Sequence, residues 1–267
     1  MSKSKTREHV SPLLNEVVDL VTEDAEKAEL LNAFFASVFT AKASNQEPQT
    51  LEVGESVSSK ADSPSITEDW VRDHLGKSDS HKSMGPDGKN PRELRELADV
   101  IAMPLSITYD MSWRTGEVPK DWRKANVKPV FKKGNKEDPG NYQPVSLISI
   151  LGKVMEQLIL DFISKHVEEK IFIRSGQHGF TKGKSCLNKM IAYYDIMSGW
   201  VDEGRAVDIA YLYFSKAFDT VSHNILIDKL RKCRLDETTV RWIVNWLSGR
   251  AQRIVIQQRS VQLEACN

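Results

Sequence analysis

The sequence predicts an α+β fold that is mostly helical, and three observations support this class. Several segments repeat apolar residues at spacings of three and four, the period of an amphipathic helix. Only three short runs have the alternation or β-branched content of strands. These runs are not regularly interleaved with helices, as a repeated βαβ unit requires. A length of 267 residues allows one large or two ordinary domains.

The first 80 residues are predicted to be a separate part of the chain. An amphipathic helix is expected over Thr22–Thr40, with acidic residues at its start. Residues 41–65 are polar and lack aromatic side chains, which predicts a flexible linker. A short helix should follow Thr67. The chain has no net charge, but residues 1–80 carry −7, so residues 81–267 carry +7.

The remaining elements follow from periodicity, caps and turn residues. Pro104 is expected to separate two helices, and Asp236 should cap the last helix. Gly134–Tyr142 is rich in turn residues and predicts a loop. The predicted helices are Pro91–Met103, Leu105–Thr115, Leu151–Lys170, Ser185–Glu203, Asn224–Cys233 and Glu237–Ser248. The predicted strands are Val127–Phe131, Ala206–Phe214 and Gln252–Gln258.

Composition excludes several classes of protein. No apolar run approaches the roughly 18 residues of a membrane span, so we expect no membrane partner. No apolar segment of the kind found in secretory signals follows Met1. The three cysteines, at positions 186, 233 and 266, are too scattered for a disulfide framework and fit a reduced, intracellular protein. A nuclear or cytoplasmic location is expected, and the oligomeric state is left open.

Metal and nucleophile motifs are weak, whereas one basic cluster is informative. No zinc-ligand spacing, P-loop or serine elbow occurs. Spacing alone favours a capping or structural role for Asp219 over a metal ligand. Lys120–Lys136 holds seven basic residues and one acid, together with Trp122 and Phe131. Such a segment suits phosphate contacts and base stacking, although composition equally allows an ordinary solvated surface.

Seven ordered motifs carry a resemblance to a known family. They are GPDG (Gly85–Gly88), WRTGEVPKDW (Trp113–Trp122), PVFKKG (Pro129–Gly134), DPGNYQPVSL (Asp138–Leu147), GKVMEQLI (Gly152–Ile159), QHGFTKGKSC (Gln177–Cys186) and FSKAFDTVSH (Phe214–His223). Together they resemble the reverse transcriptase of non-LTR retrotransposons, the jockey-like LINE elements. The resemblance implies polymerase fingers and a partial palm over residues 81–267, after an N-terminal helix and linker.

The resemblance also implies an activity and its partners. The family copies an RNA template from a DNA primer, using deoxynucleotides and Mg²⁺. By position, Lys132 and Lys133 would touch phosphates, and the backbone at Lys216 and Ala217 would meet the triphosphate. Phe218 would exclude a ribose hydroxyl. Gln177, Gly179 and Phe180 would line the template and nucleotide pocket.

Three departures predict that this copy does not polymerise. Tyr213 stands at the family's metal-binding aspartate position, and Gln143 replaces a phosphate-binding arginine. The chain stops at Asn267, before the family's Ala-Asp-Asp segment. No metal site is therefore expected to be intact, and Mg²⁺ binding is doubtful. Two alternatives remain open: a non-catalytic nucleic-acid-binding remnant, or the unfolded product of a decayed element.

Overall fold

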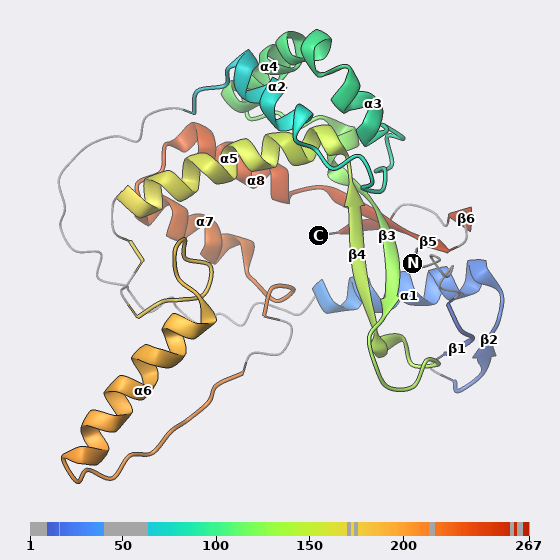
Figure 1. Cartoon of the computed structure of the whole chain (residues 1–267). Coiled ribbons are helices and arrows are strands. Elements are labelled where there is room, and N and C mark those ends of the chain that lie inside the picture. The colour runs from blue at the N-terminus through green and yellow to red at the C-terminus, as the bar shows by residue number, and fades with distance from the viewer. Residues whose placement is uncertain are drawn as a thin grey trace, which may run out of the picture.

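The computed structural model (Figure 1) describes residues 10–15, 17–39, 64–169, 172–173, 176–213, 217–256, 259–260 and 264–266. It contains both helices and strands, as the sequence predicts. Most helices form a body at the top of Figure 1, the sheet lies below it on the right, and α6 (Cys186–Asp202) extends away at the lower left. Most of the predicted linker, namely residues 41–63, lies outside the described residues.

The helical body packs around one apolar core. Its helices are α2 (Glu68–Gly76), α3 (Pro91–Glu96), α4 (Ala98–Thr115), α5 (Ile150–Glu169), α7 (His223–Lys232) and α8 (Glu237–Leu247). Two predicted helix starts are confirmed by capping bonds: Thr67 Oγ1 accepts from the Trp70 amide at 3.2 Å, and Asp236 Oδ1 accepts from the Thr239 amide at 2.9 Å. Because α2 contributes fully buried side chains to this core, it is part of the body.

The motif Trp113–Trp122 joins α4 to α8. Trp113 is buried, and its indole N–H donates to Thr239 Oγ1 at 3.0 Å. Gly116 ends α4 in the left-handed conformation, with φ of 75°, and its carbonyl accepts from Asn245 at 2.7 Å. A short 3₁₀ turn, η1 (Lys120–Arg123), then buries Trp122 against the same core. This motif is therefore accounted for by packing.

The predicted helix break at Pro104 is wrong. The break lies at Leu97, between α3 and α4, and Pro104 lies inside α4. Pro104 and its neighbours Val100 and Met103 face solvent, while the opposite side of α4 is buried against the core. Water can therefore hydrate the carbonyl that loses its amide partner, and tertiary packing offsets the cost of the proline.

The sheet has five strands among the described residues. They are β3 (Lys124–Phe131), β4 (Tyr142–Ile148), β5 (Arg250–Ile256), β6 (Arg259–Ser260) and β7 (Glu264–Cys266). The order is β4-β3-β5-β6, and β7 also pairs with β5. β3 runs antiparallel to β4 and parallel to β5. The predicted strands at the positions of β3 and β5 are confirmed, with Ile254 and Ile256 both buried.

Strand β4 was not predicted from the sequence, and it contains a proline, Pro144. Pro129 and Pro144 are direct partners in the β3–β4 ladder. The bond from the Lys132 amide to the Asn141 carbonyl, 2.9 Å, shows that the 132–141 pair is a hydrogen-bonded one. Hydrogen-bonded pairs alternate with non-hydrogen-bonded pairs along an antiparallel ladder, so the pairs 130–143 and 128–145 are hydrogen-bonded as well. The proline pair lies between them at a non-hydrogen-bonded position, where neither residue needs an amide proton. The two prolines therefore fit without loss of a ladder bond.

An N-terminal layer covers one face of the sheet. Helix α1 (Asp24–Phe39) confirms the predicted helix, and it lies across the strands in Figure 1. Leu31 and Phe35 of α1 pack with Val127, Tyr142 and Ile254 in a second apolar core. Two short strands, β1 (Leu13–Leu14) and β2 (Leu20–Val21), pair with each other before α1. On the opposite face of the sheet, Lys128, Gln143 and Val145 are exposed, and their neighbours on that face are half-buried.

The predicted strand at Ala206–Phe214 is wrong over its described residues. Residues 206–213 have no regular secondary structure, and Phe214 lies outside the described residues. Tyr211, Leu212 and Tyr213 are 82%, 85% and 94% exposed. A strand needs a neighbouring strand for its backbone hydrogen bonds, and no such neighbour lies in the part of the chain that the structure describes. The alternating pattern of apolar residues was therefore not enough to predict a strand here.

Helix α6 confirms the predicted helix over Ser185–Glu203. Ser185 caps it, since Ser185 Oγ accepts from the Asn188 amide at 3.2 Å. None of its residues is buried. Among the described helices, none combines the length and apolar character that crossing a membrane requires.

Gly85 is expected to be intolerant of a side chain. A Cβ atom there would lie 2.6 Å from the Ile148 carbonyl carbon and oxygen, where β4 meets α5. Backbone atoms cannot move aside cheaply, so the turn must shift and the bond from Ser149 Oγ to Asp87 Oδ2, 2.7 Å, is lost. We expect Gly85→Ala to lower the free energy of unfolding by about 2–3 kcal/mol in chemical denaturation.

The matched control is Gly76→Ala at the end of α2, where a Cβ meets no atom within 4 Å. Alanine favours helix over glycine, so this variant should be neutral or up to about 1 kcal/mol more stable. Equal effects of the two variants would contradict the close approach at Gly85.

Candidate nucleic-acid interface

The side of the sheet opposite α1, which we call the open face, carries two basic, two polar and three apolar side chains. The open face consists of Asn126, Lys128, Val130, Gln143, Val145, Leu147 and Arg253. Lys128 pairs with Val145 and Val130 with Gln143, so the four share one side of the ladder. Lys128 and Gln143 are exposed.

Arg253 joins the open face from the other end of the chain. It lies beside Asn126 in the parallel β3–β5 ladder, and its Nε donates to Asn126 Oδ1 at 2.7 Å. This bond fixes the side chain next to the strand that carries Lys128. Arg253 was not predicted from the sequence. The only local signal is its position between Gln252 and Ile254, which are both buried on the opposite face.

The loop between β3 and β4 holds the two predicted lysines, Lys132 and Lys133. Its shape is fixed internally: Asp138 Oδ1 accepts from the Gly140 amide at 2.8 Å, and Asn141 Nδ2 donates to the Asn135 carbonyl at 3.0 Å. Gly134 has a φ of 97° and faces the Asn141 side chain. Both lysines are exposed. Strand alternation places Lys132 on the same side as Gln143.

A second group of predicted residues meets at the base of α6. The Phe180 and Phe218 rings lie edge to face with centroids 5.8 Å apart, and both side chains are exposed. Gln177 and Gly179 belong to the same loop, in which the Gln177 carbonyl accepts from Lys184 Nζ at 3.0 Å. Phe180 has a φ of 57°, in the left-handed region that residues other than glycine seldom adopt.

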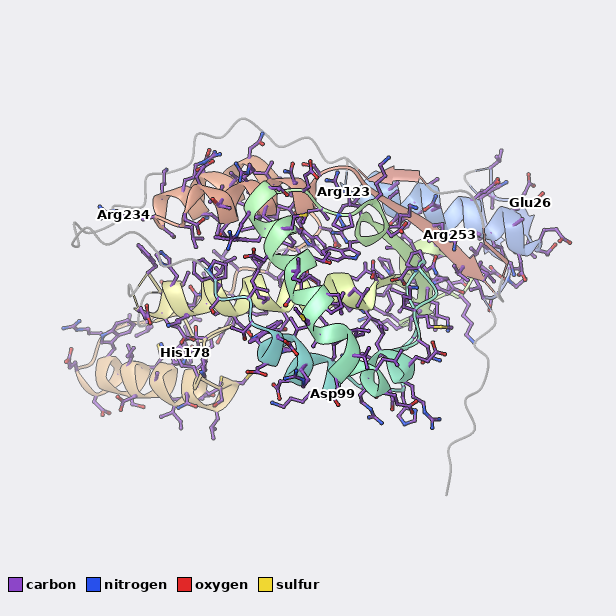
Figure 2. All side chains as sticks on the ribbon, turned by 90° about the horizontal axis from the view of Figure 1, so that it is seen from above. Glu26, Asp99, Arg123, His178, Arg234 and Arg253 are labelled. Atoms are coloured by element: carbon purple, nitrogen blue, oxygen red, sulfur yellow. The ribbon has the colours of Figure 1, made fainter. Side chains whose placement is uncertain are left out.

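The two groups of predicted residues are separate in space. Figure 2 shows His178, in the loop that carries Phe180, and Arg253, on the open face, at opposite sides of the molecule. The structure therefore places Lys132 and Gln143 on one side of the β3–β4 hairpin, with Lys133 next along the loop, and brings Phe180 together with Phe218. It does not bring these two groups together. Ala217 lies in an exposed turn beside Phe218, and Lys216 lies outside the described residues.

The position of the expected metal ligand is open to solvent. Tyr213 is 94% exposed. Its neighbour Tyr211 shares a 3.3 Å contact between hydroxyls with Tyr193, and this hydrogen bond raises the pKa of Tyr193. No cluster of three or more His, Cys, Asp or Glu side chains suited to a metal occurs among the described residues. Mg²⁺ prefers carboxylate oxygens, so the residues around Tyr213 do not fit it.

A further basic pair lies where α5 begins. Burial lowers the pKa of Lys153, and the nearby ammonium of Lys82 lowers it further, while Glu156 opposes the change. This pair was not predicted from the sequence, because Lys82 and Lys153 belong to segments that only the fold brings together.

Comparison with known proteins places these groups in a family. Residues 131–266 match the family model described as reverse transcriptase (RNA-dependent DNA polymerase). The match covers the loop after β3, strand β4 and the Phe180–Phe218 contact. The chain therefore belongs to the reverse transcriptase family, and the relatives below confirm the predicted resemblance to non-LTR retrotransposon enzymes.

Three relatives illustrate the similarity. The chain is 28% identical over 152 residues to a probable RNA-directed DNA polymerase from transposon BS of Drosophila melanogaster, covering 57% of this chain and 17% of that protein. It is 26% identical over 211 residues to the RNA-directed DNA polymerase from mobile element jockey of Drosophila funebris, covering 77% and 23%. It is 24% identical over 151 residues to a retrovirus-related Pol polyprotein from type-1 retrotransposable element R2 of Popillia japonica, covering 57% and 21%. The chain spans about a fifth of the length of these curated relatives.

Proposed function

We propose that this chain is a nucleic-acid-binding portion of a reverse transcriptase, and that it does not synthesise DNA by itself. The family activity is RNA-directed DNA synthesis on a template and primer. In this proposal the β3–β4 hairpin and the helical body correspond to polymerase fingers. The segment that includes residues 205–222 corresponds to the first part of the palm.

The observation that carries the binding proposal is the gathering of cations on one face. Lys128 and Arg253 come from strands distant in sequence, and Lys132 extends the same side of the hairpin. Strand and loop geometry hold these groups without help from a ligand. Exposed, prepositioned cations bind phosphates and release counterions, whatever the base sequence. RNA template, DNA primer and deoxynucleotides all present such phosphates.

Gln143 supports a weakened form of this site. It lies beside Val130 on the open face, at the position where the family has arginine. An amide can donate a hydrogen bond to phosphate, but it adds no charge and cannot form the two parallel bonds of a guanidinium. We therefore infer that the site binds nucleic acid weakly, and that charge at this position limits its affinity.

Charge changes on the open face should move affinity in both directions. We expect Lys128→Glu to weaken binding of a labelled RNA–DNA primer-template roughly tenfold, and Gln143→Arg to strengthen it roughly three- to tenfold. Fluorescence anisotropy at fixed salt measures both dissociation constants. Tighter binding by Gln143→Arg is the more informative result, because a misfolded variant does not bind more tightly.

Lys232→Glu, an exposed site on α7 away from the sheet, makes the same charge change and should leave affinity within about twofold. If Lys128→Glu and Lys232→Glu weaken binding equally and Gln143→Arg has no effect, the open face is not the binding surface.

The absence of DNA synthesis is proposed on the identity of residue 213. A neutral hydroxyl is a weaker Mg²⁺ ligand than a carboxylate. Two-metal phosphoryl transfer relies on carboxylates that hold two ions about 4 Å apart. Tyr213 supplies no such group, and its position is exposed rather than enclosed.

A further inference from the structure

One half-buried arginine, Arg123, has no hydrogen-bond or ion-pair partner within the part of the chain that the structure describes. It lies in η1, directly after the buried Trp122. Its Nε is enclosed by protein, yet no acceptor faces it. The nearest acid in the sequence, Asp121, pairs instead with Lys124, at 2.9 Å from Lys124 Nζ. The charge of Arg123 is therefore left without a counterpart.

The other half-buried arginines among the described residues each reach an oxygen. They are Arg72, Arg250 and Arg253, whose acceptors are the Asp69 carboxylate, the Trp246 carbonyl and the Asn126 side chain. A guanidinium has five N–H donors and a full charge, so its partial burial is costly when nothing compensates it. Water can accept from the donors, but it does not neutralise the charge. An unsatisfied group of this kind indicates a place for an ion or ligand.

The guanidinium of Arg123 lies where α8 passes into β5 (Figure 2). A Cβ atom on Gly249 would lie 3.3 Å from Arg123 Nη1, closer than such atoms usually approach. Gly249 has a φ of 62°, which glycine adopts without strain. Because residue 249 has no side chain, the guanidinium has room beside the backbone of this turn.

The surroundings of Arg123 are positively charged. Residues 120–124 and 249–250 contain one acid, Asp121, and four basic side chains: Lys120, Arg123, Lys124 and Arg250. An excess of cations in a small region attracts anions and disfavours a cationic ligand. The chemistry of the ligand is thereby limited to an anion.

We propose that Arg123 binds a phosphate group at the junction of η1 with the turn from α8 to β5. A guanidinium matches the oxygens of phosphate with two parallel hydrogen bonds. Burial of Trp122 in the helical core fixes the backbone of η1, so Arg123 is in place before the anion arrives. Arg123 is not part of the open face, and a free phosphate ion has the same chemistry as a nucleic-acid phosphate. The site therefore does not depend on the function proposed for the open face.

The probe for this site is inorganic phosphate, and the readout is the midpoint of thermal unfolding by circular dichroism. In about 10 mM phosphate the midpoint should be roughly 2–4 °C higher than in chloride of the same ionic strength, as for an anion bound with millimolar affinity. Arg123→Gln should show no such rise. In chloride this variant should melt no lower than the unmodified chain, because it loses no hydrogen bond.

Arg92→Gln is the matched control, because it makes the same charge change at an exposed arginine of α3 that pairs with Glu96 at 3.0 Å. It should keep the full response to phosphate. Three results would each overturn the proposal: no rise in the unmodified chain, an equal rise in Arg123→Gln, or a lower midpoint of Arg123→Gln in chloride. The last result would mean that Arg123 already has a partner within the chain.

Binding of an RNA–DNA primer-template, measured by fluorescence anisotropy without phosphate in the buffer, identifies the source of the bound group. If Arg123→Gln binds roughly threefold more weakly than Arg92→Gln, the nucleic-acid backbone supplies the phosphate. If the two bind equally, a rise with phosphate that depends on Arg123 assigns the site to a free phosphate ion or a phosphorylated small molecule. A failure of Lys128→Glu to weaken binding would contradict the open face alone, so the two proposals fail separately.

Discussion

Trp242→Ala is expected to lower the free energy of unfolding by about 3–5 kcal/mol, the largest stability effect at any single position considered. Trp242 is 1% exposed at the centre of the helical core. Its ring stacks on Trp246 with centroids 5.0 Å apart, and its Nε1 donates to Ser112 Oγ at 3.1 Å. The alanine variant leaves a cavity between α4 and α8 and removes the donor from a buried hydroxyl.

Trp200→Ala removes the same side chain from α6, where it is 41% exposed, and should cost less than about 1 kcal/mol. Urea denaturation followed by circular dichroism measures both variants. A cooperative transition in the unmodified chain would also argue against an unfolded product. If both variants had the same midpoint, Trp242 would not be part of a packed core.

The purified chain is expected to show no template-dependent extension of an oligo(dT) primer on an oligo(A) template, with Mg²⁺ or Mn²⁺. Loss of a metal carboxylate removes charge stabilisation worth several kcal/mol, which lowers the rate by orders of magnitude. Tyr213 is the residue on which this expectation rests.

Competition separates binding from catalysis in the same assay. Because the proposed open face still binds phosphates, an excess of this chain should inhibit extension by a competent reverse transcriptase. The Lys128→Glu variant should inhibit less, whereas Lys232→Glu should inhibit as the unmodified chain does. Template-dependent extension by the unmodified chain alone would show that Tyr213 does not abolish activity.

Local sequence signals predicted the elements that local interactions stabilise. The helices at Thr67, Ser185 and Asp236 begin at residues whose side chains cap them, and those bonds form within a few residues of sequence. Features set by tertiary structure were not predictable in this way. Pro104 lies within a helix because its solvent-facing side tolerates it, and Pro144 lies within β4 because of the ladder phase.

The candidate site shows the same division. Lys132 and Gln143 were identified from motifs, but their shared side of one ladder depends on the β3–β4 register. Arg253 lies on the same face, beside Asn126, only through a parallel pairing between segments far apart in the chain. The prediction of a strand at Ala206–Phe214 was wrong over its described residues for a related reason. The apolar residues do alternate, but a strand must pair with a neighbouring strand, which the local sequence cannot reveal.

The central claim is that the open face of the sheet binds phosphates through positioned cations. The most direct measurement is the affinity of the unmodified chain for an RNA–DNA primer-template at two salt concentrations. If Lys128, Lys132 and Arg253 neutralise two or three phosphates, affinity should fall roughly 10- to 40-fold between about 50 and 200 mM salt. An affinity that does not change with salt would contradict the claim.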